Sequence, residues 1–268
     1  MTARGEARRR ASDAAREHEA YVSRLEVFLS SRDAGLGLTK DRLEHGWTRD
    51  AAVEAAAAVA AFVDEAIDVV RQEYRPTIAC RIGCDHCCCK PGVLVSWPEL
   101  FRILDHIERN FSSAEVRRVY QRAFEYAALL DGRNPNDPID EPVPCPLLSE
   151  GRCSVYEVRP ATCRGYNSTD ASACRAARVN HRVLIPISAI VKDAADGATV
   201  GVAHAMQALG LKDSMIDLGT ALNVAGARVD AALSAAGDGR LAAAEMETWA
   251  QELWEAVMMT ARQCGVEV

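Results

Sequence analysis

The sequence has no apolar run long enough to cross a membrane. Its longest stretch without a charged residue, Gly197 to Leu211, has 15 residues, whereas a membrane-spanning helix needs about 20 mainly apolar residues. The basic residues Arg8–Arg10 are followed by Ala-Ser-Asp and not by the apolar segment of a signal peptide. We therefore expect a soluble, cytoplasmic protein with no membrane partner.

Positive charge is also scarce. The chain has 31 Lys and Arg residues against 38 Asp and Glu residues, which gives a formal net charge of −7. Phosphate binding needs clustered basic residues, so we expect no nucleic-acid partner. The sequence also has no Ser-His-Asp constellation, no glycine-rich phosphate loop and no paired carboxylates that would indicate a common catalytic site.

Strand–helix alternation and internal repeats are absent as well, and helical periodicity dominates. Apolar residues recur at steps of three and four from Val53 to Tyr74, after Thr48 as a candidate N-cap. The segments Ser96-x-x-Glu99 and Ser112-x-x-Glu115 are capping boxes that begin two more helices. We predict a mostly α fold, a single helical domain over residues 1–268, with at most a small hairpin that turns at Glu150-Gly151.

Other helices are expected at both ends of the chain. Gly35 and Gly37 should interrupt the first helix, and Asp170 should cap a short helix that carries Cys174. The last three helices are expected near Pro186–Leu209, Ser214–Ala235 and Arg240–Gln263.

Cysteine is what the sequence has in excess. Five of the ten cysteines lie in the run Cys80-Arg-Ile-Gly-Cys84-Asp-His-Cys87-Cys88-Cys89. A second, looser run contains Cys145, Cys153, Cys163 and Cys174. Crowded thiolates repel one another and a bound cation removes that cost. In a reducing cytosol such clusters are typical of metal sites. We predict a cysteine-cluster metal-binding module over residues 76–178.

Eight cysteines, four from each run, are the candidate metal ligands: Cys80, Cys84, Cys87, Cys88, Cys145, Cys153, Cys163 and Cys174. Adjacent cysteines usually point in different directions, so the eight thiolates fit either two tetrahedral sites or one polynuclear site. All-sulfur sites suit zinc or iron, including an iron–sulfur cluster, and the residues leave that choice open. They also leave open whether Cys89 or His86 joins the site, while Cys264 reads as a packing residue.

Two known kinds of protein share parts of this pattern. Cys80, Cys84 and Cys87 have the spacing of a radical S-adenosylmethionine cluster, but the strand–helix alternation of that fold is missing. The two runs together resemble the CxxCxxCC cysteine-cluster family, also called YkgJ-like and described as a zinc- or iron-chelating domain. The resemblance rests on the first run and on the segment Gly151-Arg-Cys-Ser-Val-Tyr-Glu-Val-Arg-Pro-Ala-Thr-Cys-Arg-Gly-Tyr166. The three-residue gap before Cys84 and the extra Cys89 depart from the family pattern.

The resemblance implies a cytosolic protein that chelates zinc or iron, and it keeps two alternatives open. A related cysteine pattern occurs in flagellin lysine methylase, an iron–sulfur protein, so one alternative is an iron-dependent enzyme that modifies a peptide or small molecule. The other is an interaction module whose loops are stapled by zinc. Under the leading hypothesis the two cysteine runs must meet in space, because ligands of one ion lie within about 4 Å of each other.

Overall fold

The computed structural model describes residues 3–46, 48–81, 83–131, 142–180, 182–210 and 215–235. Within these ranges eight α-helices hold most of the residues, and the strands form two short antiparallel pairs. The prediction of a mostly α fold is therefore confirmed. None of the helices in the described ranges combines the length and the apolar character that crossing a bilayer requires.

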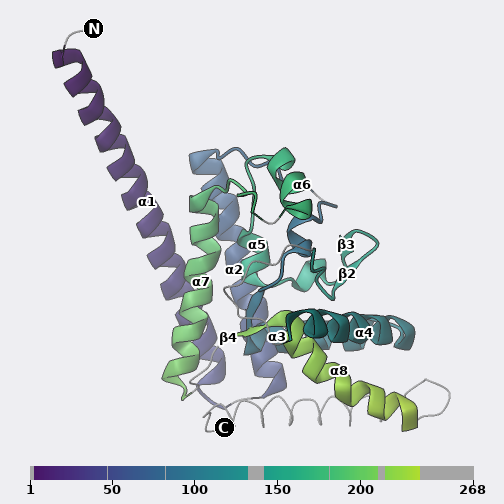
Figure 1. Cartoon of the computed structure of the whole chain (residues 1–268). Coiled ribbons are helices and arrows are strands. Elements are labelled where there is room, and N and C mark those ends of the chain that lie inside the picture. Colours follow the sequence, from purple (N-terminus) through teal and green to yellow (C-terminus); the bar gives the residue numbers. More distant parts are fainter. Residues whose placement is uncertain are drawn as a thin grey trace.

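Helices α1 (Ala3–Leu43) and α7 (Ala189–Ala208) pack with their backbones in contact (Figure 1). A Cβ added to Gly197 would lie 2.2 Å from the carbonyl oxygen of Phe28, and one added to Gly201 would lie 2.0 Å from that of Arg32. Both contacts advance in the same direction along the two helices, so α1 and α7 run parallel. Glycine permits this approach because it has no Cβ.

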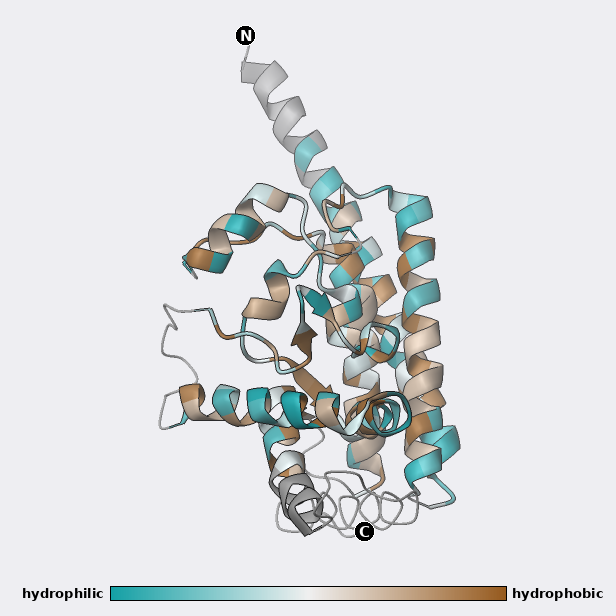
Figure 2. Ribbon diagram, turned by 90° about the vertical axis from the view of Figure 1, so that its right-hand side faces the viewer, coloured by the Kyte–Doolittle hydropathy of each residue, from teal (hydrophilic) through white to brown (hydrophobic). Residues whose placement is uncertain are grey.

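The expectation that Gly35 and Gly37 interrupt the first helix is wrong, since α1 continues to Leu43. Gly35 is a packing residue, because a Cβ there would lie 2.3 Å from the carbonyl oxygen of Ala198. A helical glycine costs only about 1 kcal/mol relative to alanine, and the close contact with α7 offsets that cost. The N-terminal part of α1 extends past α2 and α7 (Figure 1), and the first turns of α1 that Figure 2 colours are hydrophilic.

Helix α2 (Arg49–Tyr74) packs against both α1 and α7 and begins and ends as the sequence predicts. The side chain of Thr48 accepts a hydrogen bond from the Ala51 backbone N–H and caps the start. Arg75 adopts a left-handed conformation at the C-cap, immediately before Pro76. The chain then leaves the helix and enters the first cysteine run.

The second half of the core is built on a short strand pair. Strand β1 (Leu94–Ser96) pairs antiparallel with β4 (Met215–Asp217), and α3 (Trp97–Asn110), α4 (Ser113–Leu130) and α8 (Leu218–Ala235) follow from these segments. Both predicted capping boxes form, at the starts of α3 and α4. The helix expected from Ser214 begins only at Leu218, because Met215–Asp217 pair with β1 instead.

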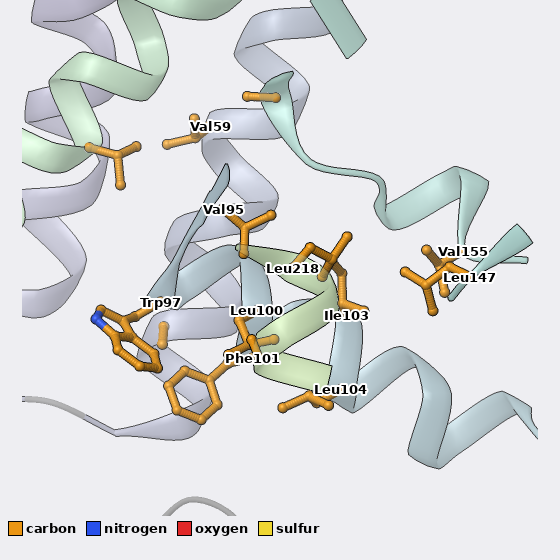
Figure 3. Packing of buried hydrophobic residues seen from close by; sticks show 14 of the residues in the cluster. Val59, Val95, Trp97, Leu100, Phe101, Ile103, Leu104, Leu147, Val155 and Leu218 are labelled. Carbon is orange, nitrogen blue, oxygen red and sulfur yellow. The ribbon is translucent and has the colours of Figure 1, made fainter. Parts of the chain in front are cut away.

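Apolar side chains from all of these elements form one cluster. Val95, Leu100 and Ile103 are almost fully buried at its centre, and Leu218 brings α8 against them (Figure 3). Leu147 and Val155, from the second cysteine run, lie at the far end of the same cluster (Figure 3). The cysteine-rich segment is thus anchored in the core of the helical domain.

The cysteine-rich segment is made of short elements on one side of α2 (Figure 1). These are the 3-10 turn η1 (His86–Cys89), strands β2 (Leu148–Ser149) and β3 (Arg152–Cys153), the 3-10 turn η2 (Tyr156–Val158), α5 (Ala161–Gly165) and α6 (Ala171–Val179). The hairpin turns at Glu150 and Gly151 as predicted, with φ values of 51° and 72°. The predicted helix Arg240–Gln263 and Cys264 lie outside the described residues.

Candidate metal centre

The two cysteine runs meet through their backbones. The Cys145 N–H donates to the Cys88 carbonyl oxygen at 2.7 Å, and the Val143 N–H donates to the Cys89 carbonyl oxygen at 3.1 Å. The 3-10 turn and the start of the second run therefore lie side by side, although more than fifty residues separate them in sequence. None of the nine described cysteines is in a disulfide.

Cys145 and Cys153, at the hairpin, each accept a hydrogen bond at the sulfur from the backbone N–H two residues later in the chain. Leu148 pairs with Cys153 across the strands, and the Ser154 N–H donates to the Leu147 carbonyl oxygen at 2.9 Å. Hydrogen bonds from the backbone N–H groups of Leu147 and Val155 to the Cys145 and Cys153 sulfurs oppose the rise in pKa of these thiols. Such N–H donors stabilise a thiolate, and they would equally stabilise a metal-bound sulfur.

Four cysteines gather at this hairpin, and we call them the hairpin group: Cys88, Cys145, Cys153 and Cys163. Burial raises the pKa of Cys163, and negative charge on Cys145 or Cys153 raises it further. Burial also raises the pKa of Cys145 to about 12, with a further contribution from Cys153. These thiols lie close enough together for a charge on one to affect the protonation of the next.

Four other cysteines gather near helix α6, and we call them the helix group: Cys80, Cys84, Cys87 and Cys174. Burial raises the pKa of Cys80, and negative charge on the other three members raises it further. The Ser168 backbone N–H donates to the Cys80 sulfur at 3.2 Å, and the Ala79 N–H donates to the Ser168 carbonyl oxygen at 2.7 Å. This pairing holds the start of the first run beside the segment that leads into α6.

Cys87 and Cys88 join the two groups. A hydrogen bond between their side chains lowers the pKa of Cys87 and raises that of Cys88. Negative charge on Cys87 also raises the pKa values of Cys80, Cys153 and Cys163. Cys87 therefore lies between the helix group and the hairpin group.

The eight cysteines that the sequence names as candidate ligands are distributed over these two groups. Their role as metal ligands stays a prediction. Within the described part of the chain, no three His, Cys, Asp or Glu side chains are arranged as a set that could hold a metal ion. The donor chemistry still fits zinc or iron, because each group offers four sulfurs and tetrahedral thiolate sites are typical of these metals. Binding would require the buried thiols to lose their protons and turn toward the ion.

Cys89 and His86 were left open by the sequence, and the structure places them differently. Cys89 is buried, and it belongs to neither group. Burial and the nearby Asp85 and Cys87 raise its pKa, whereas the nearby Arg178 opposes that rise. His86 has a buried Nδ1 with no hydrogen-bond partner, 3.7 Å from an Asp85 carboxylate oxygen. His86 therefore keeps a free donor or acceptor beside the cysteine turn.

Polar side chains that the sequence did not mark as site residues hold the short elements in place. The buried Glu99 carboxylate accepts a hydrogen bond from the Ala161 N–H at 2.7 Å, which fixes the start of α5. Asn167, also buried, donates to the Gly165 and Ser188 carbonyl oxygens at 3.0 and 3.1 Å. Glu99 already appears in a capping box, but nothing in the sequence indicates its second contact.

The arginines near the cysteines have distinct partners. Arg164 binds Asp64 of α2 and donates to the Glu157 and Arg159 carbonyl oxygens at 2.6 and 2.9 Å. Arg164 therefore ties η2 to the helical domain, and its hydrogen bonds are not directed at a sulfur. Arg159 stacks over the Tyr156 ring at 4.0 Å, and its charge opposes the rise in pKa that burial causes at Cys153.

A family-model comparison finds a match over the cysteine-rich segment. Residues 79–182 match the model of the CxxCxxCC family, described as "putative zinc- or iron-chelating domain". This range contains all eight predicted ligands and covers nearly the same residues as the predicted module. No curated protein and no solved structure matches the chain.

Proposed function

We propose that the CxxCxxCC domain at residues 79–182 chelates zinc or iron through the eight cysteines of the helix and hairpin groups. The backbone pairing of Cys145 with Cys88 is the observation that carries the proposal, because it places a cysteine of the second run directly beside a cysteine of the first. Structural cysteines in a core need not gather, whereas ligands of a shared centre must.

The bound metal would organise the loops of the domain. Strands of two residues and a helix of five residues are too short to be stable alone, and metal binding couples directly to folding. Zinc would act as a structural ion, and iron or an iron–sulfur cluster would add redox or enzymatic chemistry at the same sulfurs. A cytosolic location fits this function, because reducing conditions keep the thiols free.

The metal content of protein purified without oxygen tests the proposal. We expect stoichiometric zinc in a colourless protein, or iron with sulfide in a brown one. The variants Cys84→Ser and Cys163→Ser should each lower the metal content and the melting temperature, because structural metal ions contribute on the order of 10 kcal/mol in small domains. Cys89→Ser is the control and should keep the wild-type metal content.

Two results would contradict the proposal. One is a wild-type protein that binds neither zinc nor iron when reconstituted under reducing conditions. The other is unchanged metal content in both Cys84→Ser and Cys163→Ser.

A further inference from the structure

We infer that Arg122 and Tyr126 of α4 are positioning residues of the metal centre, and that each holds the backbone of one cysteine run against this helix. Arg122 holds the second run just after Cys145, and Tyr126 holds the first run just after its 3-10 turn. This inference rests on the proposed function and adds to it two residues that do not themselves bind the metal.

Arg122 bonds to the start of the second run. Its Nε–H donates to the Pro146 carbonyl oxygen at 2.7 Å. Pro146 directly follows Cys145, whose own N–H donates to the Cys88 carbonyl oxygen at 2.7 Å. A hydrogen bond from a charged donor contributes about 1.5–3 kcal/mol, more than one between neutral groups. Arg122 therefore fixes the second run at the residue next to the pairing between the runs.

Tyr126 bonds to the segment by which the chain leaves the first run. Its hydroxyl oxygen accepts the Gly92 N–H at 3.1 Å, and the hydroxyl donates to an Asp217 carboxylate oxygen at 3.0 Å. Gly92 is the third residue after Cys89, and its φ of 87° places it in the left-handed region that glycine permits. Asp217 is fixed in turn, because its other carboxylate oxygen accepts the Thr220 N–H at 2.9 Å. Tyr126 thus joins the end of the cysteine turn to the strand pair and α8.

The two side chains lie one turn apart on α4. Residues four apart share a face of an α-helix and are separated by about 6 Å along its axis. Between their two targets lie the backbone bonds from Cys145 to Cys88 and from Val143 to Cys89. One face of α4 therefore contacts both runs, one on each side of their pairing. Neither run can shift along the other without breaking the bond from Arg122 or the bond from Tyr126.

Helix α4 contains a natural control for the Tyr126 hydroxyl. Tyr120 and Tyr126 are 3% and 4% exposed, and each ring packs against a glycine of α8. A Cβ added to Gly226 would lie 2.7 Å from the Tyr120 ring, and one added to Gly219 would lie 2.2 Å from the Tyr126 ring. The Tyr120 hydroxyl is buried and has no hydrogen-bond partner in the part of the chain that the structure describes. The two tyrosines therefore share their packing and differ in what the hydroxyl holds.

A metal centre depends on this kind of support because its ligands must be placed accurately. Thiolate sulfurs lie about 2.3 Å from a bound zinc ion, so a small shift of one run weakens the bonds to the ion. Loss of a residue that orients ligands typically lowers metal affinity 10–100-fold. Val119 and Ala123 bury the opposite turns of α4 in the core, so the helix is a rigid base for both runs.

The zinc affinity of four variants, measured by competition with a chromophoric chelator, tests the inference. Tyr126→Phe and Arg122→Gln should each weaken zinc binding about tenfold. Tyr120→Phe and Arg118→Gln are the matched controls from the same helix and should keep the wild-type affinity, since Arg118 is exposed. Wild-type affinity in Tyr126→Phe and Arg122→Gln would overturn the inference and leave the proposed function intact. A wild-type protein without metal would instead refute the proposed function.

Amide hydrogen exchange of the metal-free protein separates positioning from a general loss of stability. In Tyr126→Phe the amides of Gly92 and Cys145 should exchange faster, because the first run is released beside the second. The amide of Val63, in the middle of α2, should keep its wild-type rate. In Tyr120→Phe all three rates should stay unchanged. An unchanged rate at Cys145 in Tyr126→Phe, or an equal acceleration at Val63, would overturn the inference.

Discussion

Glu99 should contribute more to stability than its motif indicates, and the chain contains its own control. Glu99 and Glu115 occupy the same position in two capping boxes and make the same bonds to the preceding serine. Glu99 alone also accepts a hydrogen bond from the Ala161 N–H, and it does so in the buried interior. The pair Glu99→Ala and Glu115→Ala therefore measures the value of the second contact together with that of burial.

The magnitude follows from the groups left without partners. In Glu99→Ala the N–H groups of Ser96 and Ala161 lose their acceptor in a region where both residues are at most 2% exposed. Each orphaned buried donor costs about 1–3 kcal/mol, while removing a buried carboxylate relieves part of its desolvation cost. We expect a net loss of roughly 3 kcal/mol, which lowers Tm by about 6–12 °C.

Glu115→Ala should cost clearly less, because Ser112 and Glu115 are exposed and water replaces the lost acceptor. Urea unfolding of both variants, with and without metal, measures the difference. Glu99→Ala should also weaken metal binding, because it releases the start of the helix that carries Cys163. Equal stability losses in the two variants would refute the reasoning.

Three other perturbations have defined outcomes. Arg178→Met should weaken zinc binding about tenfold, as loss of a residue that orients ligands typically does; chelator competition measures this, and Arg178→Lys should retain most of the affinity. Gly201→Ala should destabilise the protein by about 1–3 kcal/mol through overpacking, whereas Gly37→Ala, with nothing within 4 Å of its Cβ, should stabilise it by up to about 1 kcal/mol in urea unfolding. The neutral Cys145 thiol, its pKa raised by burial to about 12, should stabilise the metal-free protein fully below about pH 9, and this contribution should disappear as pH rises to 12. Alkaline denaturation measures it, and an unchanged profile in Cys145→Val would contradict it.

Local signals in the sequence predicted the parts of the fold that depend on local chemistry. The capping boxes, the Thr48 cap and the turn at Glu150-Gly151 each depend on a few neighbouring residues, so the local sequence determines them. The prediction that Gly35 interrupts the first helix was wrong because of a tertiary contact. The lack of a side chain at Gly35 serves contact with α7, a partner more than 150 residues away, and no local pattern records that.

The candidate ligands could be named from the sequence because crowded cysteines have few other uses. Their grouping could not be predicted, because it depends on how α6 turns back to the first run through Ser168 and Arg178. Asn167 and the second contact of Glu99 were missed for the same reason: each satisfies backbone groups of a distant segment, and only the folded chain shows that these groups are near.

The polar contacts around the cysteines also explain why a metal centre would be placed on a helical domain. The elements that carry the ligands have little regular hydrogen bonding of their own, so their backbone groups are satisfied by Glu99, Asn167, Arg164 and the sulfurs. The helices therefore fix the outer ends of the loops, while the inner ends carry the cysteines. A bound cation would displace the thiol protons and link these inner ends, so metal affinity should depend on residues of α3 and α6 that do not themselves bind the metal.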